Sequence, residues 1–112
     1  FTHLAKNKNP TCGDEMEIRL RITDDKIIDF GYQSKSCIYC QASASLLSIN
    51  TKNKKIEIIK QLIHDFEDFF SNSSNKFKKK WPKYKVLFNK KNLARKGCLL
   101  LPFQTLKKAL KS

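Results

Sequence analysis

The sequence contains no long apolar run and no segment that resembles a signal peptide. A membrane-spanning helix needs roughly 18 or more consecutive apolar residues, and a signal peptide combines a charged start with an apolar stretch and a small-residue cleavage site. We therefore expect a cytoplasmic protein without a membrane segment. With 112 residues the chain is large enough for one hydrophobic core but not for two, so a single domain over residues 1–112 is expected.

The sequence also lacks the cysteine pattern of a disulfide framework. Its four cysteines, Cys12, Cys37, Cys40 and Cys98, are unevenly spaced in a lysine-rich chain. In a chain without a secretion signal, such cysteines more often bind a metal or react as thiols than form disulfides. Metal binding or thiol chemistry is therefore the first function to consider.

Acidic residues are absent from residues 69–112, which hold twelve lysines and Arg95. Residues 1–68 hold ten basic and ten acidic side chains, so the whole net charge of +13 comes from the C-terminal part. Such a surface could bind a nucleic acid or an acidic protein, and aromatic residues among the lysines of residues 76–96 could stack on bases. The alternative, which we favour, is that the lysines are solvated and the aromatic residues are buried.

Two strands are predicted in the N-terminal half. Apolar residues alternate with charged ones over residues 16–22, a pattern typical of a half-buried strand. Residues 23–26 predict a turn, and residues 27–32 predict the returning strand. Because Cys12 and Asp14 precede the first strand and Cys37 follows the second, both segments are expected at the same end of the sheet.

Helices are predicted after this hairpin. Residues 41–47 are rich in alanine and other small residues, which favours a short helix that packs closely on the sheet. Over residues 56–70 apolar residues recur every three or four positions, which indicates an amphipathic helix. His64 and Asp65 fall on its polar side, so His64 is expected to be a surface histidine rather than a ligand.

Two further helical segments are predicted in the basic part of the chain. The apolar residues of 76–91 include Phe77 and Val86 and predict the buried side of a short helix, with Pro82 in its first turn. Pro102 predicts the start of the last helix, with Cys98 just before it. The elements together predict an α+β fold, in which helices cover one face of a small antiparallel sheet.

The segment Cys12-Gly13-Asp14 separates a thiol from a carboxylate by one glycine. Because Gly13 tolerates a positive φ, the chain can bend until both side chains point at a common centre. Cys37 and Cys98 could complete the set, since three thiolates and a carboxylate suit tetrahedral zinc or part of an iron–sulfur site. A rival set uses all four cysteines, with Cys37 and Cys40 as a zinc-finger-like pair; Cys40 could instead turn into the core.

The order of four motifs resembles the U-type iron–sulfur assembly proteins, the IscU/NifU/SufU family. The motifs are Asn9-Pro10-Thr11-Cys12-Gly13-Asp14, Ser36-Cys37-Ile38, Ala42-Ser43-Ala44-Ser45, and Arg95-Lys96-Gly97-Cys98 followed by Leu106 and Ala109-Leu110. The long interval between Cys37 and Cys98 is similar to the SufU branch, as is Gly97 in the place where the IscU branch has histidine. The resemblance covers roughly residues 9–110.

The chain departs from the family pattern in three places. Ser36 stands where the family usually has glycine, Cys40 is an additional thiol, and the family's N-terminal helix and first strand are expected to be missing. The resemblance otherwise implies a SufE/NifU-like fold with a metal site at one end of the sheet. It also favours Asp14 over Cys40 as the fourth ligand beside the cysteines at 12, 37 and 98.

The resemblance implies a function in iron–sulfur cluster assembly. Cys12 matches the thiol that accepts sulfane sulfur from a SufS-like cysteine desulfurase, and Arg95 matches an arginine that could stabilise a released thiolate. The zinc ligands would be Cys12, Asp14, Cys37 and Cys98. The alternative is a scaffold that builds a [2Fe–2S] cluster on the same four residues. Either protein would pass sulfur or cluster to downstream assembly or acceptor proteins and would depend on the desulfurase rather than act as a stand-alone enzyme.

Overall fold

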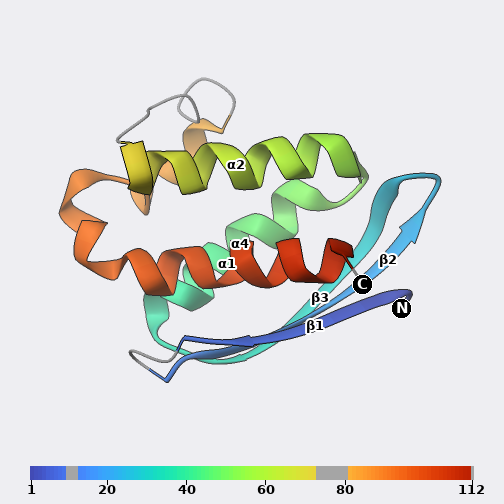
Figure 1. The fold of residues 1–112 in the computed structure, drawn as a ribbon, viewed down its shortest axis with the longest axis horizontal. Helices are drawn as coiled ribbons and strands as arrows, with labels where there is room; N and C mark the ends of the chain where they lie inside the picture. The colour runs from blue at the N-terminus through green and yellow to red at the C-terminus, as the bar shows by residue number, and fades with distance from the viewer. Residues whose placement is uncertain (10–12, 73–80, 112) are drawn as a thin grey trace.

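The computed structural model describes residues 1–9, 13–72 and 81–111. One antiparallel sheet has the strand order β1-β2-β3-β4, and the helices lie on one of its faces (Figure 1). The predicted α+β class, with helices on one face of a small antiparallel sheet, is confirmed. The bounds of the elements are β1 His3–Lys8, β2 Glu15–Thr23, β3 Lys26–Lys35, α1 Ile38–Thr51, β4 Lys54–Lys55, α2 Ile56–Asn72, η1 Pro82–Val86, η2 Lys90–Arg95 and α4 Lys96–Lys111, where η denotes a 3-10 helix.

The hairpin of β2 and β3 follows the predicted alternation. Met16, Ile18 and Leu20 point into the core and are at most 2% exposed. Asp24 and Asp25 connect the strands with φ values of 53° and 60°. Two successive positive φ values are the mark of a type I′ turn, whose twist matches that of the strands it joins. The returning strand continues three residues beyond its predicted end, to Lys35.

Strand β1 was not predicted from the sequence. It pairs antiparallel with β2, with Ala5 opposite Ile18. Ala5 is its one fully buried residue, and the strand is otherwise polar or partly exposed, as suits the edge of a sheet. A strand therefore precedes the Cys12-Gly13-Asp14 segment. The expectation that the family's N-terminal helix and first strand are missing stays a prediction.

Helices α1 and α2 correspond to the two helices predicted after the hairpin, although α1 is longer than expected. His64 is exposed, as predicted. The placement of Asp65 on the polar side was wrong, because its side chain is only 3% exposed. Its carboxylate accepts a hydrogen bond of 2.9 Å from Nε2 of Gln61, one turn earlier in the same helix. This bond offsets part of the cost of burying the charge.

The last helix begins earlier than predicted. Helix α4 starts at Lys96, so Cys98 lies in its first turn and Pro102 lies inside it. Proline has no N–H, so Pro102 cannot donate to the carbonyl of residue 98. The prediction treated the proline as a start signal. Pro102 is buried, and the apolar residues on either side of it, at 99–101 and 103, are at most 5% exposed; their burial outweighs the missing bond.

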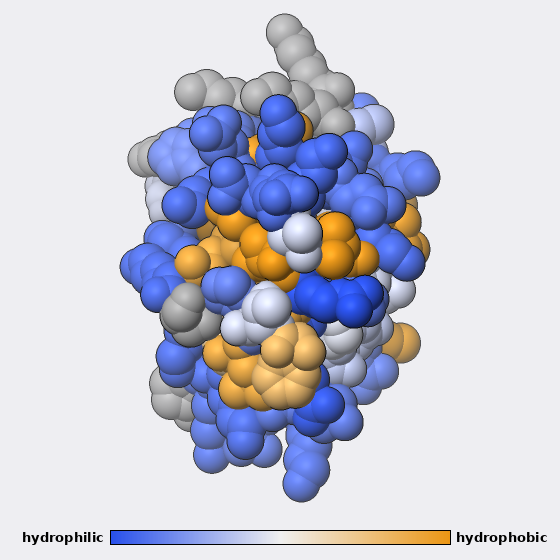
Figure 2. Space-filling model, turned by 90° about the vertical axis from the view of Figure 1, so that its right-hand side faces the viewer, coloured by the Kyte–Doolittle hydropathy of each residue, from blue (hydrophilic) through white to orange (hydrophobic). Residues whose placement is uncertain are grey.

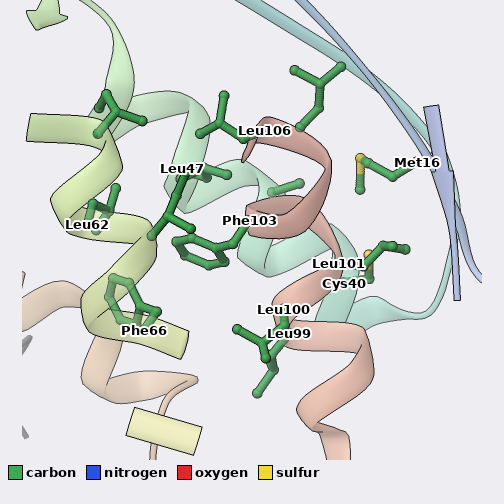
Figure 3. Close-up of a cluster of buried hydrophobic side chains, with 14 of the residues drawn as sticks. Met16, Cys40, Leu47, Leu62, Phe66, Leu99, Leu100, Leu101, Phe103 and Leu106 are labelled. Carbon is green, nitrogen blue, oxygen red and sulfur yellow. The ribbon is translucent and has the colours of Figure 1, made fainter. Parts of the chain in front are cut away.

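Two aromatic residues of the basic segment, Tyr84 and Phe88, belong to the core. Rings of Phe66, Tyr84, Phe88 and Phe103 pack together, and the centroid of Phe66 lies 4.6 Å from Tyr84 and 4.5 Å from Phe88. Figure 3 shows Phe66 of α2 and Phe103 of α4 beside Leu47 of α1. Pro82 starts a helix as predicted, but this helix is of the 3-10 type. Val86 was wrongly placed in the core, because it is 78% exposed, and Phe77 lies outside the described residues.

Within the described ranges, no helix combines the length and the apolar character needed to cross a bilayer.

Candidate metal centre

Three elements converge at one end of the sheet. Strand β1 ends and β2 begins there, α1 begins there, and the N-terminus of α4 lies beside them (Figure 1). Each element contributes one side chain to a common centre: Asp14 comes from the turn, Cys37 from the start of α1 and Cys98 from the first turn of α4. One ligand atom from each of these residues lies within 4.8 Å of the other two.

This spacing suits a small tetrahedral ion. With Zn–S bonds of about 2.3 Å and Zn–O bonds of about 2.0–2.2 Å, tetrahedral donors lie roughly 3.3–3.8 Å apart. The three groups therefore need to approach by about 1.0–1.5 Å at most to share one zinc ion. Two sulfurs and one carboxylate oxygen also match the preference of zinc for mixed donors. The residues fit a zinc ion with one position left for a further ligand.

The turn before β2 positions Asp14. Gly13 has a φ of 77°, as its predicted tolerance of positive values allows. The backbone N–H of Gly13 donates to the carbonyl of Asn9 at 2.8 Å, and the N–H of Asn9 donates to the carbonyl of Asp14 at 2.8 Å. These two bonds join the ends of the turn, and Asp14 is buried, at 7% exposure. Cys12, the predicted sulfur acceptor, lies outside the described residues, so its place in the site stays a prediction.

Both cysteines of the described site stand at helix N-termini. Cys37 is the N-cap residue of α1, with φ −69° and ψ 167°, and it is half-buried. Cys98 is the third residue of α4 and is 9% exposed. The N-terminus of a helix carries the positive end of its dipole, which favours negative groups nearby. Two such ends face the same centre and help to offset the charge of the thiolates and carboxylate that would gather there.

Cys40 lies in a different environment. It is fully buried on α1 and belongs to the main hydrophobic cluster. Figure 3 shows it among buried apolar side chains, near Leu101. Within the described part of the chain, the candidate metal group contains the other two cysteines and Asp14 but not Cys40. Its burial disfavours the rival set of four cysteines.

Arg95 is held at the edge of the site by an aromatic ring. Its guanidinium carbon lies 5.0 Å from the centroid of Tyr39, a cation–π arrangement. Tyr39 follows Cys37 by two residues, and Arg95 precedes Cys98 by three. The predicted role of Arg95 in stabilising a thiolate stays a prediction. Sequence reasoning missed Tyr39, because no local pattern indicates which ring a distant arginine will contact.

The described part of the basic segment, residues 81–96, offers little aromatic surface for stacking bases. Of the aromatic residues in the described part of 76–96, Tyr84 and Phe88 are completely buried and Trp81 is half-buried. Base stacking needs exposed ring faces. The burial of these rings disfavours the nucleic-acid hypothesis and supports the alternative that they pack in the core.

Comparisons with known sequences find similarity to iron–sulfur cluster assembly proteins. The family model described as the NifU-like N terminal domain matches residues 2–79. The chain is 33% identical over 111 residues to the iron–sulfur cluster assembly scaffold protein IscU of Thermotoga maritima, an alignment that covers 98% of this chain and 78% of that protein. It is 32% identical over 60 residues to the zinc-dependent sulfurtransferase SufU of Bacillus subtilis, covering 54% of this chain and 41% of that protein.

Solved structures agree with the sequence relatives. A crystal structure described as a putative iron–sulfur cluster assembly scaffold protein for the SUF system, from Fervidobacterium islandicum, superposes with a TM-score of 0.86 at 25% identity. The match covers 97% of this chain and 80% of that chain. A nitrogen-fixing NifU-like protein (N-terminal) from Brucella abortus shares the fold with a TM-score of 0.77 at 18% identity, over 96% of this chain and 76% of that chain.

Proposed function

The chain belongs to the NifU-like N-terminal domain family, and we propose that it serves iron–sulfur cluster assembly by accepting and passing on sulfane sulfur at a zinc-bound cysteine site. The observation that carries this proposal is the convergence of Asp14, Cys37 and Cys98, whose ligand atoms lie within 4.8 Å of one another. A relative named as a zinc-dependent sulfurtransferase supports the choice of zinc and of sulfur transfer.

Asp14, Cys37 and Cys98 would hold the zinc ion, and Cys12 is the proposed fourth ligand. When bound, zinc keeps its thiol ligands deprotonated and links the elements that carry them. The four ligands would not bind equally tightly, because the carboxylate oxygen is a harder ligand than a thiolate and is more easily displaced from zinc. Asp14 would therefore be the ligand most readily displaced from zinc, and Cys37 and Cys98 would keep holding the ion.

Cys12 would perform the transfer itself. Its thiolate attacks the outer sulfur of a persulfide on the donor, a new S–S bond forms on Cys12, and the S–S bond of the donor breaks. The donor cysteine leaves as a thiolate, so no oxidant or reductant is consumed. Such exchange needs an accessible thiolate near a positive group, and the positive ends of α1 and α4 would supply that field. The proposed donor is a SufS-like cysteine desulfurase, and the proposed acceptors are downstream assembly proteins.

The second candidate is a scaffold on which a [2Fe–2S] cluster is built as cargo. It is favoured by the IscU relative, which aligns with 98% of this chain. The same donors would hold the cluster, since thiolates are the usual ligands of iron–sulfur centres. Zinc in the resting protein and stimulation of a desulfurase would support transfer, whereas a labile cluster after anaerobic reconstitution would support scaffolding.

The test is metal content by elemental analysis of protein purified without chelator. The parent chain is compared with the variants Asp14→Ala, Cys98→Ser and Cys40→Ser. We expect about one zinc per chain in the parent and in Cys40→Ser, and substantial loss in the other two variants. Metal that is lost with Cys40→Ser but kept with Asp14→Ala would indicate a four-cysteine structural site and remove the chemical basis of sulfur transfer.

A further inference from the structure

Ser43 makes a buried hydrogen bond between the two helices that carry the cysteines. Its Oγ donates to the carbonyl of Leu99 at 2.8 Å, and the two residues are 56 positions apart in the chain. Ser43 has no exposed surface. Helix α1, which begins directly after Cys37, is thereby tied to the residue of α4 that follows Cys98.

The hydrogen bond of Ser43 lies where a small shift of α1 along α4 would change the spacing of the two cysteines. Ser43 lies six residues after Cys37, about 9 Å along α1, and its acceptor is one residue from Cys98. A slip of α1 against α4 by one residue would move the two cysteines by about 1.5 Å relative to each other. Such a slip would change the spacing of donor atoms that now lie within 4.8 Å of one another by up to about 1.5 Å, which is as large as the whole approach that zinc binding requires.

The hydrogen bond adds a directional constraint to the apolar packing between α1 and α4. On α1, the buried residues around Ser43 include Cys40, Ala44 and Leu47. Hydrophobic attraction has no preferred direction, and small side chains leave a smooth surface, whereas a hydrogen bond requires a particular distance and angle.

We propose that Ser43 is a positioning residue, whose hydroxyl sets the register of α1 against α4 and thereby the separation of Cys37 and Cys98. The proposal deepens the function proposed above, because that function requires both cysteines at one centre. It predicts that Ser43 controls thiol geometry beyond its contribution to stability. The sequence predicts that the small residues of 41–47 pack closely on the sheet, and packing is the alternative that the test must separate from positioning.

The chain offers a matched control. Thr105 is also fully buried, and its Oγ1 donates to the carbonyl of Leu101 at 2.7 Å. This bond stays within α4 and does not join two helices. Ser43→Ala and Thr105→Val each remove one buried hydroxyl, so both should lower the midpoint of thermal unfolding by a few degrees, about 4–8 °C per kcal/mol lost. Only Ser43→Ala should change the thiol separation.

The first measurement needs no metal. In a background of Cys12→Ser and Cys40→Ala, only Cys37 and Cys98 remain, and glutathione redox buffers report how readily they form a disulfide. Oxidised glutathione is reduced to two thiols as the protein dithiol is oxidised, so the equilibrium gives their effective concentration. We expect a fall of up to about tenfold for Ser43→Ala, the size that the loss of one hydrogen bond allows, and little change for Thr105→Val. Equal values for the two variants would overturn the proposal.

The second measurement uses zinc itself in the chain that keeps all four cysteines. Competition with a chelator should show the dissociation constant rising about 10–100-fold for Ser43→Ala, with Thr105→Val close to the parent. Ser43→Thr keeps the hydroxyl but adds a methyl group, so this variant should lose stability while retaining its affinity for zinc. If the zinc affinities of all three variants instead fell in proportion to their losses of stability, a positioning role would be refuted. A parent chain that binds no zinc would refute the proposed function instead, and the glutathione result would still decide the role of Ser43.

Discussion

The side chain of Asn9 occupies the space that a β-carbon on Gly97 would need. Asn9 follows β1 and closes the turn that carries Asp14 through two backbone hydrogen bonds. Gly97 precedes Cys98 in the first turn of α4. The absence of a side chain at residue 97 therefore lets the Asp14 turn lie directly against the helix that carries Cys98.

Gly97→Ala should weaken the metal centre. The new methyl group would push Asn9 away, and overpacking of this kind costs about 1–3 kcal/mol. In an open helical position the same change would stabilise the protein by about 1 kcal/mol, because alanine favours the helix. We expect a lower free energy of unfolding in urea and a weaker affinity for zinc. A fall in stability would show that the contact with Asn9 is tight, whereas a gain would show that it is not.

Gly31→Ala is the matched control. No atom outside the neighbouring residues lies within 4 Å of a β-carbon built at Gly31, which lies in β3. This variant should change stability by about 0.5 kcal/mol or less and leave zinc affinity unchanged. Should Gly97→Ala behave like Gly31→Ala, the fit between the turn and α4 would not control the site.

Tyr39 and Arg95 should be energetically coupled across the edge of the site. The guanidinium lies over the ring, and a partly exposed pair of this kind contributes about 0.5–1 kcal/mol. Tyr39→Leu removes the ring, whereas Tyr39→Phe keeps it. A double-mutant cycle with Arg95→Ala, measured by urea unfolding, should give a coupling of this size for the leucine variant. A cycle with Tyr39→Phe should give a smaller coupling, because phenylalanine keeps an aromatic ring under the guanidinium of Arg95. Additive effects of Tyr39→Leu and Arg95→Ala would show that the contact contributes nothing.

The parts of the fold that the sequence predicted are those with a local signal. The β2–β3 hairpin could be predicted because Met16, Ile18 and Leu20 alternate with charged residues. The amphipathic spacing likewise predicted α2. Strand β1 could not be predicted, because a single buried alanine gives no alternation. The start of α4 was wrong because Pro102 is locally a start signal, whereas its tolerance inside the helix depends on tertiary burial.

The candidate site divides in the same way. The hairpin predicted that Asp14 and Cys37 emerge at one end of the sheet, and the structure places them near each other. The approach of Cys98 rested on the family resemblance. No local pattern could have predicted the bond from Ser43 to Leu99 or the contact of Asn9 with Gly97, because each joins segments that only the tertiary fold brings together.

The aromatic cluster should control stability rather than ligand binding. The ring centroid of Phe66 lies within 4.9 Å of the ring centroids of Tyr84, Phe88 and Phe103. Phe66→Ala should cost about 3–5 kcal/mol in urea unfolding, because it leaves a large cavity. Val86→Ala, in the same basic part of the chain, should cost about 0.5 kcal/mol or less, since Val86 is 78% exposed. Similar small costs for both would mean that the rings do not form the core.

Tyr84 should make the protein sensitive to alkaline pH. Burial raises the pKa of its hydroxyl well above the ordinary value of 10.0, and the hydrogen bond from Nδ2 of Asn50 at 3.5 Å offsets only part of this effect. Above about pH 10 the unfolded chain loses the tyrosine proton while the folded chain keeps it. The folded state then binds more protons, so the free energy of unfolding falls as pH rises, by up to about 1.4 kcal/mol per pH unit from this group.

Tyr84→Phe removes the titration of Tyr84. The lysines titrate in both the parent and the variant, so the difference between the two proteins reports Tyr84 alone. Near neutral pH the variant should lose less than about 1 kcal/mol, because the bond to Asn50 is long. Between pH 10 and pH 12 its stability should fall less steeply than that of the parent, and the difference between the two urea-unfolding series should grow with pH. Parallel series would mean that the hydroxyl of Tyr84 ionises as easily in the folded protein as in the unfolded chain. In that case residue 84 would lie at a surface open to water, and the basic segment would again be a candidate for stacking on nucleic acid bases.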